Sequence, residues 1–375
     1  QEDVITIETA SGSVEAPVYL SELAAPGLVV MSIGQGHQSN GMNTAVSGIN
    51  PLRLLASDTH FESGGASLSA NGVTIKRTGA TLKLACTAGS LTQHGRTFAL
   101  SVETAALADH AKPHRSGLTM GHFPLTLPLP EGYDSKRDVY PPHDHDTYRW
   151  GMVVDLDRCI GCNACAAACY AENNIGVVGV KRVLQGREMA WMSVERYHSE
   201  EQMEKVTFLP MMCQHCDNAP CEAVCPVYAP HHSKEGLNTQ IYNRCIGTRY
   251  CVQNCPYKVR RFNWFTWKWP EPMNLQLNPD VTVRSKGVME KCSFCIQRIK
   301  SARNAAKNES RTIRDGEVAP ACVQTCPTDA LVFGKLLDKN SRVRQLADDP
   351  RAYQALGYLN TKPAVIYLKK VVHAI

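Results

Sequence analysis

Cysteine spacing constrains this chain more than any other feature of its sequence. Fifteen of its 16 cysteines lie between residues 159 and 326, and only Cys86 lies outside that region. A disulfide framework is typical of small secreted chains that lack a hydrophobic core. This chain has 375 residues, enough for two or three domains with cores of their own. Because the cysteines also recur in sets, mostly two or three residues apart, the pattern indicates metal ligation.

Four cysteine sets can be read directly from the sequence. They are Cys159, Cys162, Cys165 and Cys169; Cys213, Cys216, Cys221 and Cys225; Cys245, Cys251 and Cys255; and Cys292, Cys295, Cys322 and Cys326. The last three sets end in Cys-Pro, whereas Tyr170 follows the first set. In the third set, Thr248 stands where the spacing calls for a fourth cysteine.

This spacing favours iron–sulfur clusters. Three thiolates on one tight loop can each reach a different iron of a cubane, and the fourth cysteine of such a run ligates the other cluster of a pair. Structural zinc, the main alternative, usually takes closed sets of four built from two spaced pairs, often with histidine. The interlocked spacing and the Cys-Pro endings favour iron–sulfur clusters over zinc.

The internal order of the sets suggests nested pairing, the first set with the fourth and the second with the third. One [4Fe-4S] cluster is then held by Cys159, Cys162, Cys165 and Cys326, a second by Cys292, Cys295, Cys322 and Cys169, and a third by Cys213, Cys216, Cys221 and Cys255. The fourth site keeps Cys225, Cys245 and Cys251, with Thr248 at the vacant corner. A threonine hydroxyl is a far poorer iron ligand than a thiolate. We therefore expect a [3Fe-4S] cluster there; a fourth iron held by Thr248 is the alternative.

The remaining sequence predicts an α+β protein. Residues 1–105 hold short β-branched runs separated by Gly, Pro and Asn, which indicate a β-rich module. Residues 106–147 lack periodicity and are interpreted as an extended linker, with His143 and His145 in a solvated loop. Within residues 148–375, we expect helices at 290–306 and 350–359 and strands at 326–336 and 364–371.

Other features exclude some classes of function. The formal charge of +5, without any long block of like charges, does not suggest a nucleic-acid partner. No run approaches the ~18 apolar residues of a membrane-spanning helix, and 27–34 and 363–368 are interpreted as buried strands. The chain begins at Gln1 without a signal peptide or a starting Met, which predicts a processed chain or the later part of a longer polypeptide. No nucleophile triad or carboxylate pair is evident, so no catalytic residue is expected.

Two further stretches are open to more than one interpretation. Residues 257–272, "YKVRRFNWFTWKWPEP", fit either a docking surface for a membrane partner or lipid headgroups, or a hydrophobic wall over the clusters. The basic and aromatic residues concerned are Lys258, Arg260, Arg261, Trp264, Trp267 and Trp269. His231 and His232 are interpreted as part of a surface loop, with a proton or quinone route as the alternative.

The cysteine region resembles a known family. The motifs "DLDRCIGCNACAAAC", "CQHCDNAPCEAVCP", "RCIGTRYCVQNCPY", "KCSFCIQRI" and "PACVQTCPTDALVFG" are similar to those of the four-cluster electron-transfer subunits of polysulfide, dimethyl sulfoxide and nitrite reductases. This resemblance implies two ferredoxin-like modules, each with a pair of clusters, over residues 148–375. Residues 29–55 resemble the C-terminal module of molybdopterin enzymes, a six-stranded β-barrel of the double-psi type. The modules that carry the molybdenum ligand are absent, so no molybdopterin is expected.

The order of the two parts is similar to that of the iron–sulfur B subunits of alternative complex III, whose third set carries a three-iron cluster. This resemblance implies an electron-transfer subunit of a membrane-bound quinol oxidoreductase, peripheral to the cytoplasmic membrane on its periplasmic side. Its implied partners are a membrane-embedded quinol-oxidising subunit and c-type haem subunits. The alternative within oxidoreductases is the electron-transfer subunit of a molybdopterin reductase for sulfur or nitrogen compounds. A soluble polyferredoxin-like carrier or a structural module is the alternative from another class.

Overall fold

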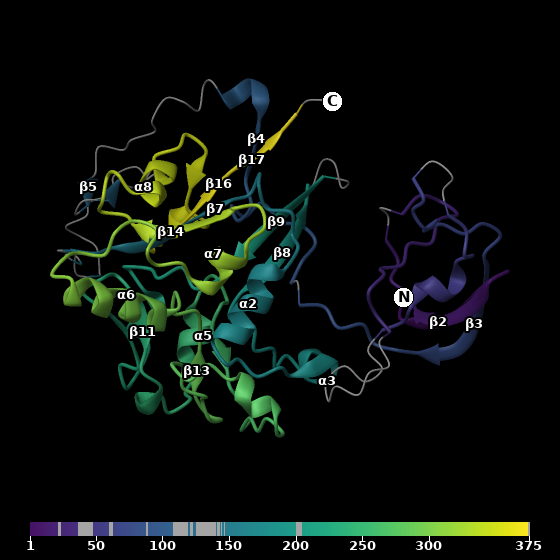
Figure 1. The fold of residues 1–375 in the computed structure, drawn as a ribbon, viewed down its shortest axis with the longest axis horizontal. Coiled ribbons are helices and arrows are strands. Elements are labelled where there is room, and N and C mark those ends of the chain that lie inside the picture. The colour runs from purple at the N-terminus through teal and green to yellow at the C-terminus, as the bar shows by residue number, and fades with distance from the viewer. Residues whose placement is uncertain are drawn as a thin grey trace. The chain divides into compact units, whose positions relative to one another are not determined.

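The structure is a computed structural model that describes residues 1–21, 24–36, 48–59, 63–87, 89–107, 119–120, 123–124, 140, 143, 145, 147–199 and 205–373. The chain divides into two compact units (Figure 1). The first comprises Gln1–Thr87 and Val177–Gly186, and the second comprises Ala88–Gly176 and Arg187–Ile375. Most of the expected linker at 106–147 lies outside the described residues; its described part includes the short strand pair β5 (Thr119–Met120) and β6 (Phe123–Pro124).

The first unit is built on a three-stranded antiparallel sheet with the order β2-β1-β3. The strands are β1 (Asp3–Thr9), β2 (Gly12–Pro17) and β3 (Thr74–Thr81), and the unit also holds η1 (Pro51–Leu54) and α3 (Gly179–Leu184). Its small core contains Ile7, Val14, Ala16 and Leu54. Alternation along β2 explains this core, because every second side chain of a strand points to the same face.

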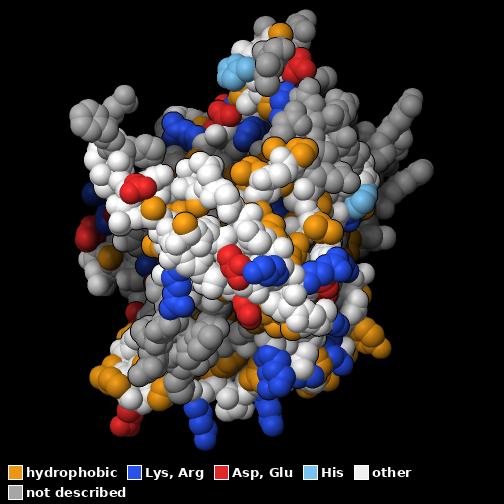
Figure 2. Space-filling model, turned by 90° about the vertical axis from the view of Figure 1, so that its right-hand side faces the viewer, with side chains coloured by type: hydrophobic (Ala, Val, Ile, Leu, Met, Phe, Trp, Pro, Cys, Tyr) orange, Lys and Arg blue, Asp and Glu red, His pale blue; other side chains and the backbone are white. Residues whose placement is uncertain are grey.

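The described residues of the first unit contain no closed sheet, so the predicted double-psi barrel is not supported. Strand β3 is exposed along its whole length. The buried strand predicted at 27–34 is wrong: these residues form no strand, and Val30 is 75% exposed. Figure 2 shows hydrophobic side chains spread between charged ones over the face that it draws.

The second unit contains a four-stranded sheet with the order β14-β7-β16-β15. The strands are β7 (Trp150–Asp155), β14 (Leu331–Lys335), β15 (Ala352–Tyr353) and β16 (Val365–Leu368). Strand β7 runs antiparallel to β14 and parallel to β16. The fully buried β16 confirms the buried strand predicted at 363–368.

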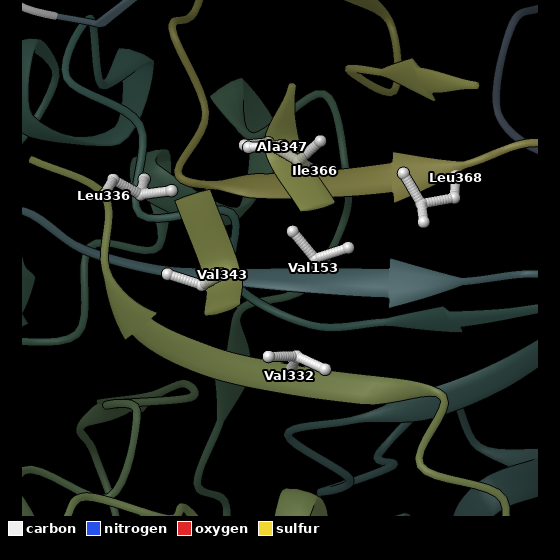
Figure 3. Packing of buried hydrophobic residues seen from close by; sticks show 7 residues of the cluster. All are labelled: Val153, Val332, Leu336, Val343, Ala347, Ile366 and Leu368. Carbon is white, nitrogen blue, oxygen red and sulfur yellow. The ribbon is translucent and has the colours of Figure 1, made fainter. Parts of the chain in front are cut away.

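Helix α8 (Arg342–Ala347) packs on this sheet and closes its core. Figure 3 shows Val343 and Ala347 of α8 beside Val153 of β7, Val332 of β14 and Ile366 of β16. Ser341 caps the helix by accepting a hydrogen bond from the Arg344 amide. This apolar core anchors the two strands that lead into the first cysteine set and out of the fourth.

Strands enclose every cysteine set. Strands β7, β9 (Val206–Met211), β11 (Asn238–Gln240) and β13 (Met289–Glu290) precede the four sets, and β8 (Ser193–His198), β10 (Pro230–His232), β12 (Arg261–Phe262) and β14 follow them. Each following strand pairs antiparallel with the next preceding one, and β14 pairs back with β7. Four antiparallel strand pairs therefore link the four cysteine loops to one another.

Short helices carry many of the cysteines. They are α2 (Ala164–Glu172), α4 (Pro220–Ala223), α5 (Tyr250–Asn254) and α7 (Ala321–Thr325). The longest helix of the described residues, α6 (Ile296–Asn308), confirms the helix predicted at 290–306, although it begins six residues later. The other elements are η2 (Thr104–Ala106), η4 (Tyr242–Arg244), η5 (Met273–Gln276), η6 (Gly357–Leu359), β4 (Ser101–Glu103) and β17 (Lys370–Val372). Small sheets with short helices confirm the α+β class.

The N-terminal module is predicted from the sequence to end at 105, whereas residues 89–107 belong to the second unit. Strand β4 pairs with the C-terminal strand β17. The Tyr353 hydroxyl donates to the Phe98 carbonyl at 2.7 Å and accepts from the Leu100 amide at 3.0 Å. These bonds join segments about 250 residues apart in the chain, so local sequence patterns do not reveal them.

The same contacts explain why the helix predicted at 350–359 is wrong. Ala352 and Tyr353 instead form β15, opposite Leu368 and Tyr367 of β16. Tertiary hydrogen bonding overrides the helical pattern, because propensity is a weak preference. Among the described residues, no helix has the length and apolar character needed to cross a bilayer.

Candidate iron–sulfur centres

Twelve of the cysteines line three cavities. The first cavity is lined by Cys159, Cys162, Cys165 and Cys326. The second is lined by Cys169, Cys292, Cys295 and Cys322. The third is lined by Cys213, Cys216, Cys221 and Cys255. Each cavity thus brings together the four cysteines that nested pairing groups, while the bound group itself stays a prediction.

The chemistry of these cysteines fits a metal cluster. None of them forms a disulfide. Burial raises the pKa of Cys165 to about 11 and that of Cys221 to about 12. A thiol with such a pKa is protonated at neutral pH, yet iron binds the thiolate. A positively charged group in each cavity would therefore supply the charge that keeps these sulfurs deprotonated.

The Cys-Pro endings form a recurring turn. The third residue after the cysteine is left-handed in all three, with φ of 53° at Tyr228, 53° at Lys258 and 52° at Asp329. In two of the turns this conformation aims the next amide at the sulfur: Ala229 N–H donates to Cys225 Sγ and Ala330 N–H to Cys326 Sγ, both at 3.3 Å. Hydrogen bonds to cluster sulfurs are one means by which proteins set reduction potentials.

The backbone places Thr248 in a cluster-binding loop. Gly161 and Asn163, on either side of Cys162, have φ of 70° and 62°. Gly247 and Arg249, on either side of Thr248, have φ of 76° and 64°. Left-handed non-glycine residues are uncommon, so the repetition of this pair marks the same loop. Thr248 therefore occupies the position in the third set that Cys162 occupies in the first.

The fourth site is assigned by comparing the helices and cysteines around it with those around the first site. Helix α2 packs on α7 beside the first two cavities, and α5 packs on α4 in the same way. Cys251 of α5 then corresponds to Cys165 of α2, and Cys225 after α4 corresponds to Cys326 after α7. Cys245, whose sulfur accepts from the Met289 amide at 3.4 Å, corresponds to Cys159. This correspondence groups Cys225, Cys245 and Cys251 around the Thr248 corner.

Electrostatic interactions and a hydrogen bond between neighbouring sites indicate that the four sites lie in a row. Burial and nearby thiolates, which include Cys165 of the first cavity, raise the pKa of Cys322 in the second. Burial and then Cys213 of the third cavity raise the pKa of Cys292 to about 12. The buried Arg260 lies against Cys221 of the third cavity and interacts with Cys251 of the fourth site. The order is therefore first, second, third, fourth.

A stacked ring pair connects the second and third cavities. His215 lies between Cys213 and Cys216, and Phe294 lies between Cys292 and Cys295. The two rings stack with centroids 3.9 Å apart, and both are fully buried. Burial lowers the pKa of His215 well below its usual value, so the imidazole is neutral. This pair was not predicted from the sequence, although the residue directly before the second cysteine of both Cys-x2-Cys loops carries a ring.

The structure corrects the docking interpretation for Arg260. Its side chain is 2% exposed, and Nη1 donates to Cys221 Sγ at 3.5 Å. Burial disfavours the charged form, but the thiolates of Cys221, Cys251 and Cys213 raise the pKa of Arg260 above its usual value. Lys291, 1% exposed, donates to the Cys292 carbonyl at 2.9 Å. Two buried cations therefore lie beside the cysteine sites.

The aromatic residues of 257–272 divide between the two interpretations. Trp267 packs against the backbone at Gly176, as a wall residue does. Trp264 is 39% exposed, and the guanidinium groups of Arg187 and Arg249 lie 5.1 and 5.0 Å from its ring centroid. Arg249 follows Thr248, so an exposed aromatic and basic group lies next to the fourth site.

Two histidine interpretations are wrong. His145 is 9% exposed rather than part of a solvated loop. The His232 side chain is 5% exposed and lies 2.9 Å from Asp217 Oδ1. The partner of His145, Asp217, is 72 residues away in the sequence, and that of His232 is 15 residues away on the other side of the Cys221 and Cys225 turns, so local patterns do not reveal either contact.

Comparison with known proteins identifies the cysteine region. Residues 158–229 and residues 204–271 each match the 4Fe-4S dicluster domain family. The iron–sulfur cluster-binding subunit of menaquinone reductase from Nitratidesulfovibrio vulgaris is 41% identical over 229 residues, which cover 59% of this chain and 89% of that protein.

Two further relatives match a similar share of this chain. A putative iron–sulfur subunit of dimethyl sulfoxide reductase from Halobacterium salinarum is 36% identical over 58% of this chain and 78% of its own length. Hdr-like menaquinol oxidoreductase iron–sulfur subunit 1 from Archaeoglobus fulgidus is 33% identical over 61% of this chain and 86% of its own length.

Proposed function

Since the chain belongs to the family of iron–sulfur subunits with 4Fe-4S dicluster domains that includes those of menaquinone and dimethyl sulfoxide reductases, we propose that it carries electrons in a membrane-bound quinol oxidoreductase resembling alternative complex III. Residues 148–375 perform this task. The observation that carries the proposal is a row of three four-cysteine cavities that continues to a site with Thr248 in place of a cysteine.

The first three sites bind [4Fe-4S] clusters and the fourth binds a [3Fe-4S] cluster, with the ligands assigned above. Such clusters accept and release single electrons, with potentials set by cluster type, hydrogen bonds to sulfur, nearby charge and exposure. Electrons from quinol enter at the fourth site and leave from the first. The names of two relatives, a menaquinone reductase subunit and a menaquinol oxidoreductase subunit, support a quinone partner, and the second name supports quinol as the electron donor.

The protein's own residues set the path. The Cys-Pro turns aim amides at Cys225 and Cys326, and Arg260 places a positive charge between the third and fourth sites. The antiparallel strand pairs between the sets hold the four sites in sequence. The His215–Phe294 stack fills the space between the second and third cavities and excludes water from it.

The partners in this proposal are a membrane-embedded quinol-oxidising subunit near the fourth site and c-type haem subunits near the first. The exposed Trp264 with Arg187 and Arg249 is a suitable contact for the membrane partner, because Trp and Arg are common at membrane interfaces. The complex places this subunit on the periplasmic side of the cytoplasmic membrane.

A second candidate function is the electron-transfer subunit of a molybdopterin reductase. The similarity to a putative dimethyl sulfoxide reductase subunit favours it. Metal analysis of the purified complex separates the two. Stoichiometric molybdenum or tungsten would contradict the alternative complex III proposal, whereas c-type haem without either metal would support it.

The cluster assignment is tested by Thr248→Cys in the intact complex, with Thr248→Ser as the matched control. The oxidised wild type and the Ser variant should both show the paramagnetic signal of a three-iron cluster. The Cys variant should lose that signal and gain about one iron per chain, because a thiolate completes the ligand set. If the oxidised wild type lacks a three-iron signal, the assignment of the fourth site is refuted.

A further inference from the structure

Three potential metal ligands from separate segments converge within the second unit. His145 precedes β7, Asp217 follows Cys216, and His232 ends β10. His145 Nε2 lies 3.2 Å and His232 Nε2 lies 2.9 Å from Asp217 Oδ1, and the three ligand atoms all lie within 4.8 Å of one another. The three side chains are 6%, 5% and 20% exposed for His145, His232 and Asp217, respectively.

The outer nitrogens of both imidazoles have acceptors of their own. His145 Nδ1 lies 3.5 Å from the Lys234 carbonyl, and His232 Nδ1 lies 3.2 Å from Glu222 Oε1. If both Nδ1 atoms donate outward, both Nε2 atoms present lone pairs toward a carboxylate oxygen. Lone pairs that face each other at about 3 Å need a cation between them. Metal-bound histidines are commonly oriented in this way, by an outer carboxylate or backbone carbonyl.

We propose that His145, Asp217 and His232 form a zinc site. Two imidazoles and one carboxylate are an established donor set for Zn²⁺, with the fourth position left to water. The site uses none of the cysteines. It does not depend on the direction of electron flow or on the kind of complex in which the subunit works.

The surrounding charges are compatible with a divalent cation. Arg149 Nη2 lies 2.9 Å from Asp217 Oδ1, and the same group donates to the His215 carbonyl at 3.2 Å, so its position is fixed. With neutral histidines, the carboxylates of Asp217 and Glu222 exceed the charge of Arg149 by one, so this set carries a net charge of −1. A Zn²⁺ ion more than offsets that excess and leaves a net charge of +1, while Arg149 orients Asp217 by its hydrogen bond.

Zinc at this position would fasten three segments together. The segment that contains His143 and His145 would be held to β10 and to the loop directly after Cys216. The His143 ring already stacks on His232 with centroids 4.3 Å apart. The site would stabilise the third cavity from outside, without any contact to its contents.

The competing explanation is a metal-free network in which both histidines are protonated against Asp217. The test uses the intact complex, purified without a polyhistidine tag and freed of loosely bound metal. Zinc is measured per chain by mass spectrometry and located by anomalous scattering at the zinc edge. Stoichiometric zinc with a peak between the three ligands is expected; no zinc, or zinc elsewhere only, overturns the proposal.

The variant His232→Phe keeps a ring against His143 but removes the ligand nitrogen. Its zinc content should fall roughly tenfold or more, while its iron content stays at the wild-type value. His94→Asn is the matched control, because His94 is an exposed histidine outside the site, and its zinc content should not change. Retention of zinc by His232→Phe overturns the proposal. If that variant fails to assemble, the anomalous peak in the wild type decides the question.

Discussion

Removing the buried charge of Arg260 should lower the reduction potential of the third cavity's cluster. The guanidinium contacts Cys221 Sγ at 3.5 Å and is 2% exposed, so solvent screens it little. A cation close to a cluster stabilises the reduced form, which carries one more negative charge. Arg260→Met keeps most of the apolar stem and removes the charge.

The size of the effect follows from Coulomb's law. An electron added to the cluster is delocalised over its iron and sulfur atoms, so its charge is centred roughly 6 Å from the guanidinium. With an effective dielectric constant of ~20, the attraction between the two charges is ~3 kcal/mol. For a one-electron couple this corresponds to a shift of about 120 mV. Relaxation of nearby water and protein dipoles reduces the shift, so we expect a decrease of about 100 mV.

The assay is a redox titration of the intact complex, followed by electron paramagnetic resonance. Arg260→Lys is the matched control: it keeps the charge, and its potential should stay within about 30 mV of the wild type. Iron content per chain verifies that the variants retain their clusters. A Met variant with full iron content and an unchanged or higher potential would refute the reasoning, because the charge would then not act on the cluster.

Three further predictions concern stability and assembly. Ile366→Ala should lower the unfolding free energy of the second unit by ~2–5 kcal/mol, and Ile366→Val by ~1 kcal/mol, because the side chain is fully buried. Denaturant titration measures both values, and no loss of stability in either variant would show that Ile366 is not buried. The Arg298 hydrogen bond lowers the pKa of Glu172 below its usual value, so this pair stabilises the fold above the carboxyl's unfolded pKa, and its contribution is lost as the pH falls. Arg298→Gln should therefore lower the melting temperature at pH 7 more than in acid, and an equal loss at both pH values would contradict the pair's role. Gly247→Ala should release iron from the fourth site, since φ is 76° and the new Cβ would meet the Gly287 carbonyl at 2.7 Å; a full iron count in this variant would show that the loop tolerates a side chain.

The sequence alone predicted the parts of this protein that depend on neighbouring residues. Cysteine spacing groups the ligands because a short loop fixes how far three thiolates can be from one another. Local helix signals predicted α6, and a short apolar run predicted the buried strand β16. The vacancy at Thr248 is likewise a local fact, and the structure adds that its loop repeats the backbone of the Cys162 loop.

Tertiary structure decided everything that joins distant segments. Arg260 is buried against Cys221, 39 residues away, although its neighbours in the sequence suggested an exposed basic surface. His145 meets Asp217 across 72 residues, so neither residue alone indicates a partner. Spacing specifies which atoms can bind metal, whereas burial and charge depend on which segments pack together. That packing is a property of the whole chain, because hydrophobic burial acts without regard to separation in sequence.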